Sequence, residues 1–314
     1  MSAQTNPSTA AATVVADQRI ENAKPSTWRR VRRNPSVLFG GTVLLIMALI
    51  AIFAPFLGTR SPTDIAPVAR NKVPGFERTV TGPDGKEQTL VYRFGSDSLG
   101  RDVYSRTIYG ARVSIIVGIT VAFLSVTIGL FIGLISGYFR WLDPIIMRIM
   151  DGLMAIPAIL LAIALVSLFR AGLGAVIVAI TLPEIPRVVR LVRSVVLSVR
   201  EEPYVEAAVT VGTPTPTLIW RHILPNTIAP LIVQGTFICA SAILVEAILS
   251  FLGIGIPPET PTWGNIMAEG RNVFRLYSHS ILYPGIFLAL TVLAVNILGD
   301  GLRDTLDPKM AKRV

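Results

Sequence analysis

The sequence has few charged residues and almost no cysteine. Only 16% of its 314 residues are Asp, Glu, Lys or Arg, and the single cysteine, Cys239, lies within an apolar run. One cysteine excludes an intramolecular disulfide and argues against a metal cluster. Soluble domains carry about a quarter charged residues, whereas this chain is 52% hydrophobic with a mean hydropathy of +0.60. The composition therefore predicts an integral membrane protein.

Sequence signatures of catalysis are also missing. There is no GxxxxGK[ST] phosphate-binding loop, and GPDGK at 82–86 has the wrong spacing for one. The patterns HExxH and GxSxG do not occur, and the two histidines, His222 and His279, fall on opposite sides of the membrane in the topology predicted below. We therefore expect no enzymatic activity, no cofactor and no metal site in this chain.

The positive charge is spread between the apolar segments. The formal net charge is +9, but lysines and arginines do not gather on one polar domain. This pattern favours retention at the inner side of a membrane over nucleic-acid binding. Residues 1–36 are predicted to form a cytosolic tail. Trp28 and Val31 share one helical face there, among four arginines, which suits a short basic amphipathic helix on lipid headgroups or a basic flank that orients the first span.

Long apolar runs predict the membrane spans, each of which needs roughly 20 apolar residues. Four runs contain no Lys, Arg, Asp or Glu, at 37–57, 113–139, 223–245 and 276–299. A fifth, at 152–169, is slightly short and extends backwards through PIIMRIM. The sixth, at 171–183, is the weakest, because it continues through Glu184, Pro186 and Arg187. Glu184 is either a functional group in the membrane or, as we favour, a partner for a nearby charge.

The distribution of basic residues supports six spans. If the N-terminal arginines are cytosolic, omitting the sixth span would place the arginines between 187 and 221 outside, against the positive-inside tendency. The predicted fold is therefore an all-α polytopic membrane protein with six transmembrane helices and both termini in the cytosol. A first span at 37–57 precedes an extracytoplasmic loop at 58–112 and a core of five spans at 113–302. This core includes a cytosolic loop at 198–225 and an external segment at 246–275, and a cytosolic tail follows at 303–314.

The second span has regularly spaced glycines. Gly129, Gly133 and Gly137 form two consecutive G-x-x-x-G patterns. Small residues at this spacing let two helices approach closely in a membrane. We therefore expect another helix to pack against this row.

The cytosolic loop at 198–225 is too polar and too long for a plain connector, which needs only a few residues. Residues 201–211 contain good helix formers, and Gly212 can adopt the positive φ that ends a helix. Pro214 and Pro216 suit the first turn of a second helix. The loop is therefore predicted to form two short helices around a bend, although a bent linker without a partner is the alternative.

This loop resembles the EAA loop of permease subunits of bacterial ATP-binding-cassette (ABC) importers. The resemblance lies in Glu206-Ala207-Ala208, Gly212 and the HILP sequence at 222–225. Four more stretches, at 94–115, 151–165, 246–267 and 300–309, resemble the second permease subunit of dipeptide, oligopeptide and nickel importers. The resemblance covers about residues 28 to 309 and implies the fold of a type I importer transmembrane domain in the bacterial cytoplasmic membrane.

The resemblance also implies partners. They are a homologous permease subunit in a heterodimer, two cytosolic ATPases that hold ATP and Mg, an extracytoplasmic solute-binding protein, and membrane lipid, with no nucleic acid. The EAA loop would dock on an ATPase through Glu206, Ala207, Ala208, Gly212, Trp220, Arg221, His222, Leu224 and Pro225. Thr213-Pro214-Thr215-Pro216 departs from the usual family pattern and stiffens the start of the coupling helix.

The external segment at 246–275 is predicted to start at Glu246. About twelve apolar residues follow, which is too short for a span and suggests a re-entrant turn. The resemblance implies an external gate, with Glu246, Phe251, Leu252 and Trp263 as candidate gate or pathway residues, and a surface loop is the alternative. The resemblance implies a dipeptide or oligopeptide as the cargo. Nickel import by the same family remains open, as does an ion-gradient-driven transporter, although no internal repeat supports the latter.

Overall fold

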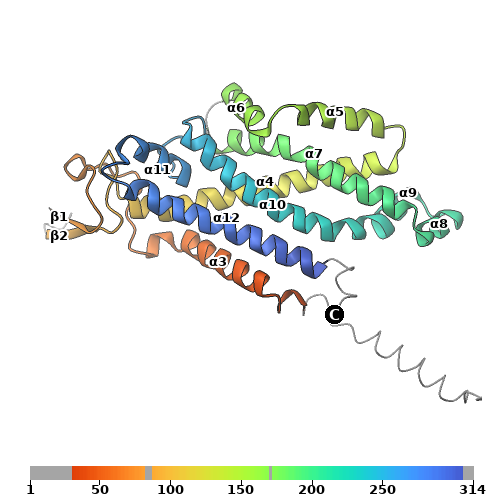
Figure 1. The fold of residues 1–314 in the computed structure, drawn as a ribbon, viewed down its shortest axis with the longest axis horizontal. Helices are drawn as coiled ribbons and strands as arrows, with labels where there is room; N and C mark the ends of the chain where they lie inside the picture. Colours follow the sequence, from red (N-terminus) through yellow and green to blue (C-terminus); the bar gives the residue numbers. More distant parts are fainter. Residues whose placement is uncertain (1–29, 82–86, 170–171, 307–314) are drawn as a thin grey trace, which may run out of the picture.

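The chain is mostly helical, with its long helices side by side. A computed structural model describes residues 30–81, 87–169 and 172–306. Five long helices run along the molecule (Figure 1). They are α3 (Pro35–Ile52), α4 (Val103–Tyr138), α7 (Leu173–Arg200), α10 (Leu224–Phe251) and α12 (His279–Leu306). Trp28 and Arg29 of the predicted basic helix, and the last eight residues of the predicted C-terminal tail, lie outside the described residues.

Several predicted spans correspond to these helices. Within the described chain, α3, α4, α12 and the continuous helical run Thr215–Phe251 are each long and apolar enough to cross a membrane. The fifth predicted span is a pair of helices, α5 (Asp143–Ala155) and α6 (Ala158–Leu168), bent by 89°. Pro157 lies at this break, where it disfavours a continuous helix. Counted as one span, the pair makes five.

Helix α7 is long but too polar to count as a span on composition. Its 28 residues correspond to about 42 Å, more than the roughly 30 Å of a hydrocarbon core. However, it contains Glu184 and four arginines. The crossing of the membrane by α7, and with it the total of six spans, therefore stays a prediction.

Segment 58–112 is more structured than a loop. It contains a hairpin of β1 (Phe76–Thr81) and β2 (Glu87–Tyr92), paired antiparallel with Phe76 opposite Tyr92. The described chain is otherwise mostly helical, in agreement with the predicted all-α class. Helix α4 starts at Val103, ten residues before the predicted boundary at 113. The side chain of Asp102 caps it by accepting from the Ser105 amide at 3.1 Å, and the polar first turns of this helix concealed its start from a hydropathy argument.

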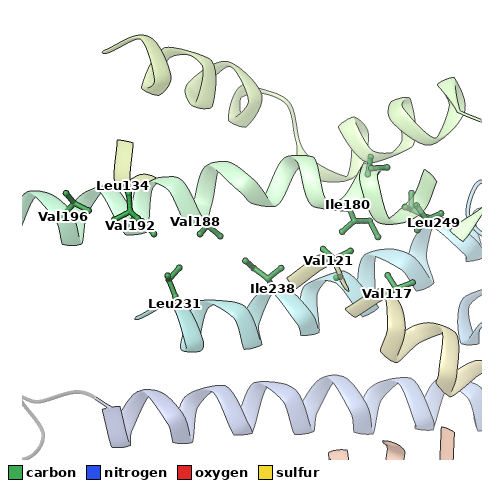
Figure 2. Packing of buried hydrophobic residues seen from close by; sticks show 14 of the residues in the cluster. Val117, Val121, Leu134, Ile180, Val188, Val192, Val196, Leu231, Ile238 and Leu249 are labelled. Carbon is green, nitrogen blue, oxygen red and sulfur yellow. The ribbon is translucent and has the colours of Figure 1, made fainter. Parts of the chain in front are cut away.

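The glycine row of α4 packs directly against α7. A Cβ added to Gly133 would lie 2.6 Å from the Cβ of Val192, and Gly129 and Gly137 meet Val188 and Val196 in the same way. The predicted close approach of another helix is therefore confirmed. Figure 2 shows Val188, Val192 and Val196 in a row along α7, next to Leu134 of α4. This contact is part of the main hydrophobic core.

We expect Gly133→Leu to destabilise the protein by about 1–3 kcal/mol, because the larger side chain must push α4 and α7 apart. Thermal unfolding of the purified protein in detergent measures this effect. Gly41→Leu in α3 is the matched control, since a Cβ there meets nothing within 4 Å. Equal melting temperatures for the two variants would contradict the packing argument.

Helix α3 is fixed along α12. A Cβ on Gly40 would lie 2.6 Å from the carbonyl oxygen of Ala294, so only glycine permits this approach. At the start of α3, the side chain of Asn34 accepts from the Ser36 amide at 2.9 Å. The N-terminal helix is therefore part of the same bundle as the core helices. The hairpin and α11 (Trp263–Gly270) lie at one end of the molecule, and α8 (Pro203–Thr210) and α9 (Thr215–Leu218) lie at the other (Figure 1).

Candidate functional site

The predicted coupling loop is anchored to the end of α4. Helix α7 ends at Arg200, whose guanidinium donates to the carbonyls of Gly137 and Tyr138 at 3.2 and 3.1 Å. These carbonyls lie at the C-terminus of α4, where intrahelical donors run out. Helix α8 (Pro203–Thr210) follows, and its Val205 is buried in the main core together with Leu218. The loop is therefore a folded unit rather than a free linker.

The bend after α8 is a Schellman motif. Gly212 has φ +83°, its amide donates to the Val209 carbonyl at 2.9 Å, and the Thr213 amide donates to the Ala208 carbonyl at 3.0 Å. This confirms the predicted positive φ at Gly212. An added Cβ would meet nothing within 4 Å, so the requirement for glycine comes from the backbone conformation alone.

The second helix of the loop continues into the next span. Helix α9 (Thr215–Leu218) has Pro214 as its N-cap and Pro216 in its first turn, as predicted. A π-helical turn, η3 (Ile219–Ile223), then leads directly into α10. Leu224 and Pro225 are therefore the first residues of α10. The helical backbone therefore runs without a break through residue 225, the predicted end of the cytosolic loop, and the point where this helix enters the membrane stays a prediction.

The loop presents an apolar surface at this end of the molecule. Glu206 and Ala207 of α8 are exposed and Ala208 is half-buried. Trp220 is 72% exposed and, with Arg221, lines a shallow pocket of about 610 Å³. His222 is half-buried beside Tyr204, with ring centroids 6.3 Å apart.

Three further residues belong to this surface that the sequence did not single out. They are Tyr204, Val209 and Val211, which are 46%, 56% and 86% exposed. Large apolar side chains grouped on the surface mark interaction sites. We refer to Tyr204, Glu206, Ala207, Val209, Val211 and Trp220 as the knob surface. These three residues could have been identified in the sequence as bulky apolar side chains within a polar loop.

At the other end, two of the four candidate gate residues are buried. Glu246 is 0% exposed, and it accepts from the Ser250 hydroxyl at 2.8 Å and from the Ser114 hydroxyl at 3.4 Å. Trp263 is also 0% exposed and donates from Nε1 to the Thr107 carbonyl at 3.0 Å. These side chains hold α10, α11 and α4 together, so they do not line a pathway on the surface of this chain.

The other two candidates lie at the surface where α10 ends. Phe251 is half-buried and Leu252 is 48% exposed. Helix α10 continues through Glu246 to Phe251, two residues before Gly253, which has φ +79°. The helix therefore extends more than one turn past Glu246, the predicted start of the external segment, and the point where the chain leaves the membrane stays a prediction. Serine partners on α4 and α10 accommodate the buried carboxyl within the helix.

A cluster of buried charges joins the external segment to α4. Arg101 pairs with Asp97 at 2.7 Å and also with Glu269, and Arg106 lies 3.2 Å from Glu269 and 3.6 Å from Asp97. The side chain of Arg106 is only 1% exposed. Burial raises the pKa of the Glu269 carboxyl, whereas the charges of Arg106 and Arg101 act to lower it. We call Asp97, Arg101, Arg106 and Glu269 the four-charge cluster.

Sequence reasoning missed this cluster because its members are far apart in the chain. Glu269 lies 163 and 168 positions from Arg106 and Arg101. No local pattern links them. The polar stretch FGSDSLGRD before an apolar span was the available signal, since buried charges need partners.

Long apolar helices with a folded loop at one end and a structured segment at the other are the features of a polytopic membrane transport subunit. A solved structure of the MetNI methionine ABC transporter in an inward-facing conformation has the same fold, with a TM-score of 0.54 and 18% identity over 64% of this chain and 96% of that one. Residues 109–312 match the family described as "Binding-protein-dependent transport system inner membrane component". The chain therefore belongs to this family of ABC importer permeases.

The N-terminal part and the relatives agree with this membership. Residues 26–74 match the N-terminal transmembrane domain of oligopeptide transport permease C. A Sinorhizobium fredii protein described as a probable peptide ABC transporter permease is 52% identical over 285 residues, covering 91% of this chain and 93% of the relative. The dipeptide transport system permease protein of Alkalihalophilus pseudofirmus is 39% identical, covering 91% of both. The resemblance seen in the sequence is confirmed.

Proposed function

We propose that this chain is a permease subunit that carries dipeptides or oligopeptides inward across the bacterial cytoplasmic membrane. Two of the relatives described above are named for peptides or dipeptides. An Escherichia coli relative, 38% identical over 90% of this chain and 89% of its own length, is named for glutathione, which also contains peptide bonds. Amides cross hydrocarbon only at a cost of several kcal/mol per unpaired group. Such solutes therefore need a hydrated pathway that opens to one side at a time.

The observation that carries the proposal is the knob surface. Its exposed apolar residues suit a groove on a cytosolic ATPase, and its helix α9 continues without a break into α10, so a movement of the knob is transmitted to a span. Glu206, Ala207, Ala208, Gly212, Trp220, Arg221, His222, Leu224 and Pro225 would take part in this coupling. Phe251 and Leu252 are the remaining candidates for the external gate.

The assembly follows from this role. The chain would form a heterodimer with a homologous permease, joined by two cytosolic ATPases that bind and hydrolyse ATP with Mg²⁺ and by an extracytoplasmic solute-binding protein. This chain would itself catalyse no reaction. Six spans, including α7, would place both termini and the knob in the cytosol, with the hairpin and the four-charge cluster outside, as expected for a type I importer.

Peptide uptake tests the cargo. We expect cells that lack this gene to lose uptake of a labelled dipeptide and to regain it when the gene is restored, with no competition from nickel ions. Uptake that is the same with and without the gene would contradict the peptide assignment, and competition by nickel would favour a metal cargo.

Charge reversal tests the coupling role. We expect the double variant Glu206→Arg, Ala207→Arg to lower peptide uptake about tenfold or more, because two large cations that find no partner in the docking groove disfavour docking. The protein should still insert into the membrane, since both side chains are exposed. The control is Glu259→Arg, which changes an exposed residue between α10 and α11, and this variant should transport normally. Normal uptake by the double variant would contradict the coupling role.

A further inference from the structure

An ion pair between Glu184 and Arg187 lies on α7 and contacts Ser241 of α10 near the middle of the bundle. Glu184 is 11 residues from the start of α7, and Ser241 is 10 residues before the end of α10, each roughly 15 Å along its helix. The Ser241 hydroxyl is 3.4 Å from Glu184 Oε1. In a hydrocarbon core of roughly 30 Å, both residues are therefore near mid-membrane in the proposed six-span topology.

Arg187 is the exposed member of this ion pair. Its side chain is 49% exposed, whereas that of Glu184 is 5% exposed. Nη1 of Arg187 alone donates to both Glu184 carboxylate oxygens, at 3.1 Å each. The Nε and Nη2 edge of Arg187 has no hydrogen bond to any described residue.

The free edge of Arg187 has the geometry that binds a carboxylate. Arg193, on the same helix, uses its own Nε and Nη2 to hold the two Asp143 oxygens at 2.5 and 2.6 Å. Planar paired donors of this kind match a carboxylate in a bidentate arrangement. The Nε and Nη2 edge of Arg187 therefore has the same donor geometry as the edge of Arg193 that holds Asp143.

A cavity with polar groups among its apolar lining lies beyond Arg187 in the direction of the knob. Leu191, one turn after Arg187, lines a cavity of about 650 Å³ between α7, α10 and α12. Gln234, Asn226 and Arg303 line the same cavity. Gln234 and Ser241 are seven residues apart on α10 and so share a helical face. Polar groups thus extend from mid-membrane to the end of the bundle that carries the knob.

The opposite side of α10 is different. A cavity of about 640 Å³ there is lined almost wholly by apolar residues of α3, α4, α10 and α12, such as Leu44, Ile115 and Ile232. A guanidinium exposed to hydrocarbon is costly, and ionisable groups in membrane helices face a water-filled cavity or the bundle interior. The polar face therefore belongs to an aqueous pathway, and the apolar side to lipid or to other helices.

We propose that Arg187 is a solute-binding residue in the pathway wall, and that its Nε and Nη2 edge binds the carboxylate of a peptide as it crosses. Glu184 positions the guanidinium and offsets its charge, so the carboxylate is held weakly enough to leave, as conduction through a site requires. This inference rests on the proposed peptide-import function and identifies the part of the solute that the wall recognises.

Transport by the complete importer, reconstituted in proteoliposomes with its solute-binding protein, tests this role. Initial uptake rates are measured for a dipeptide with a free C-terminal carboxylate and for the same dipeptide with a C-terminal amide. Each variant's rate is divided by the wild-type rate for the same peptide, which removes the binding protein's own preference. We expect R187Q to slow the free acid about 10–100-fold, the loss typical of a charge-assisted hydrogen-bonded contact, and to leave the amide nearly unchanged.

Two further variants serve as controls. R187K keeps the charge but loses the paired donors, so an intermediate loss for the free acid is expected. R148Q removes an exposed arginine from α5 and should change neither peptide. Equal effects of R187Q on both peptides, or no effect on either, would overturn the proposal. So would loss of the partner permease from the purified R187Q complex, which would show that the edge pairs with that subunit. A wild-type importer that carries neither peptide would instead overturn the proposed function.

Discussion

Glu269→Ala is expected to destabilise the protein by about 3–5 kcal/mol, because it removes one partner from a buried ionic network. Arg101 and Arg106 would then share the single carboxylate of Asp97, with the side chain of Arg106 only 1% exposed. The helix that carries Glu269, α11, would lose its ionic attachment to α4. We therefore expect a lower melting temperature of the purified protein in detergent and a lower yield from membranes.

Two variants distinguish this effect from a general loss of surface charge. Glu259→Ala removes an exposed carboxylate from the same external segment and should leave the melting temperature unchanged. Replacing Glu269 and Arg106 together by Leu and Met should restore part of the lost stability, since well-packed apolar residues can replace a buried ion pair. Equal melting temperatures for the Glu269→Ala and Glu259→Ala proteins would contradict the structural role of the cluster.

Gly212→Val is expected to lower peptide uptake about tenfold or more. A residue with a Cβ loses roughly 1–2 kcal/mol in the left-handed conformation, and a β-branched side chain is a clear outlier there. The Schellman bend between α8 and α9 would open, and the knob surface would lose the shape that we propose to dock on the ATPase. Since a side chain at this position meets nothing within 4 Å, the bundle itself should still fold and insert.

Gly212→Asn is the matched control for this effect. Asparagine tolerates the left-handed region better than other residues with a Cβ, so most of the uptake should remain. Uptake and ATP hydrolysis by the assembled importer are measured together, because a loop that no longer docks should uncouple the two. If the valine and asparagine variants transport equally well, the bend at Gly212 is not needed for coupling.

Features of the chain with a local physical cause could be predicted from the sequence. The apolar runs showed a membrane protein, and the positive φ at Gly212 followed from its place after a helix-forming stretch. The glycines at 129, 133 and 137 correctly indicated a tightly packed helix, although not that this helix would be α7. Such features depend on composition, spacing and backbone preference over a few residues.

The ends of helices were harder to predict from the sequence where a helix contains polar residues. Helix α4 begins at Val103 because Asp102 caps it and contacts with other parts of the chain bury its first turns. An argument from hydropathy therefore placed its start too late. The helix α10 likewise includes Pro225 at one end and Glu246 near the other. Proline in a first turn and a carboxyl with hydroxyl partners are both compatible with a helix, although each resembled a boundary in the sequence.

The sequence alone was enough to predict a membrane protein, most of its long apolar segments, its family and the turn at Gly212. The tertiary structure alone decided which charges meet. Glu269 reaches Arg101 across 168 positions. Among the described residues, Glu184 pairs only with Nη1 of Arg187, so the Nε and Nη2 edge has no hydrogen bond there. The reason is that pairing and exposure depend on the packing of helices distant in the chain, whereas hydropathy and turn preference depend on neighbouring residues.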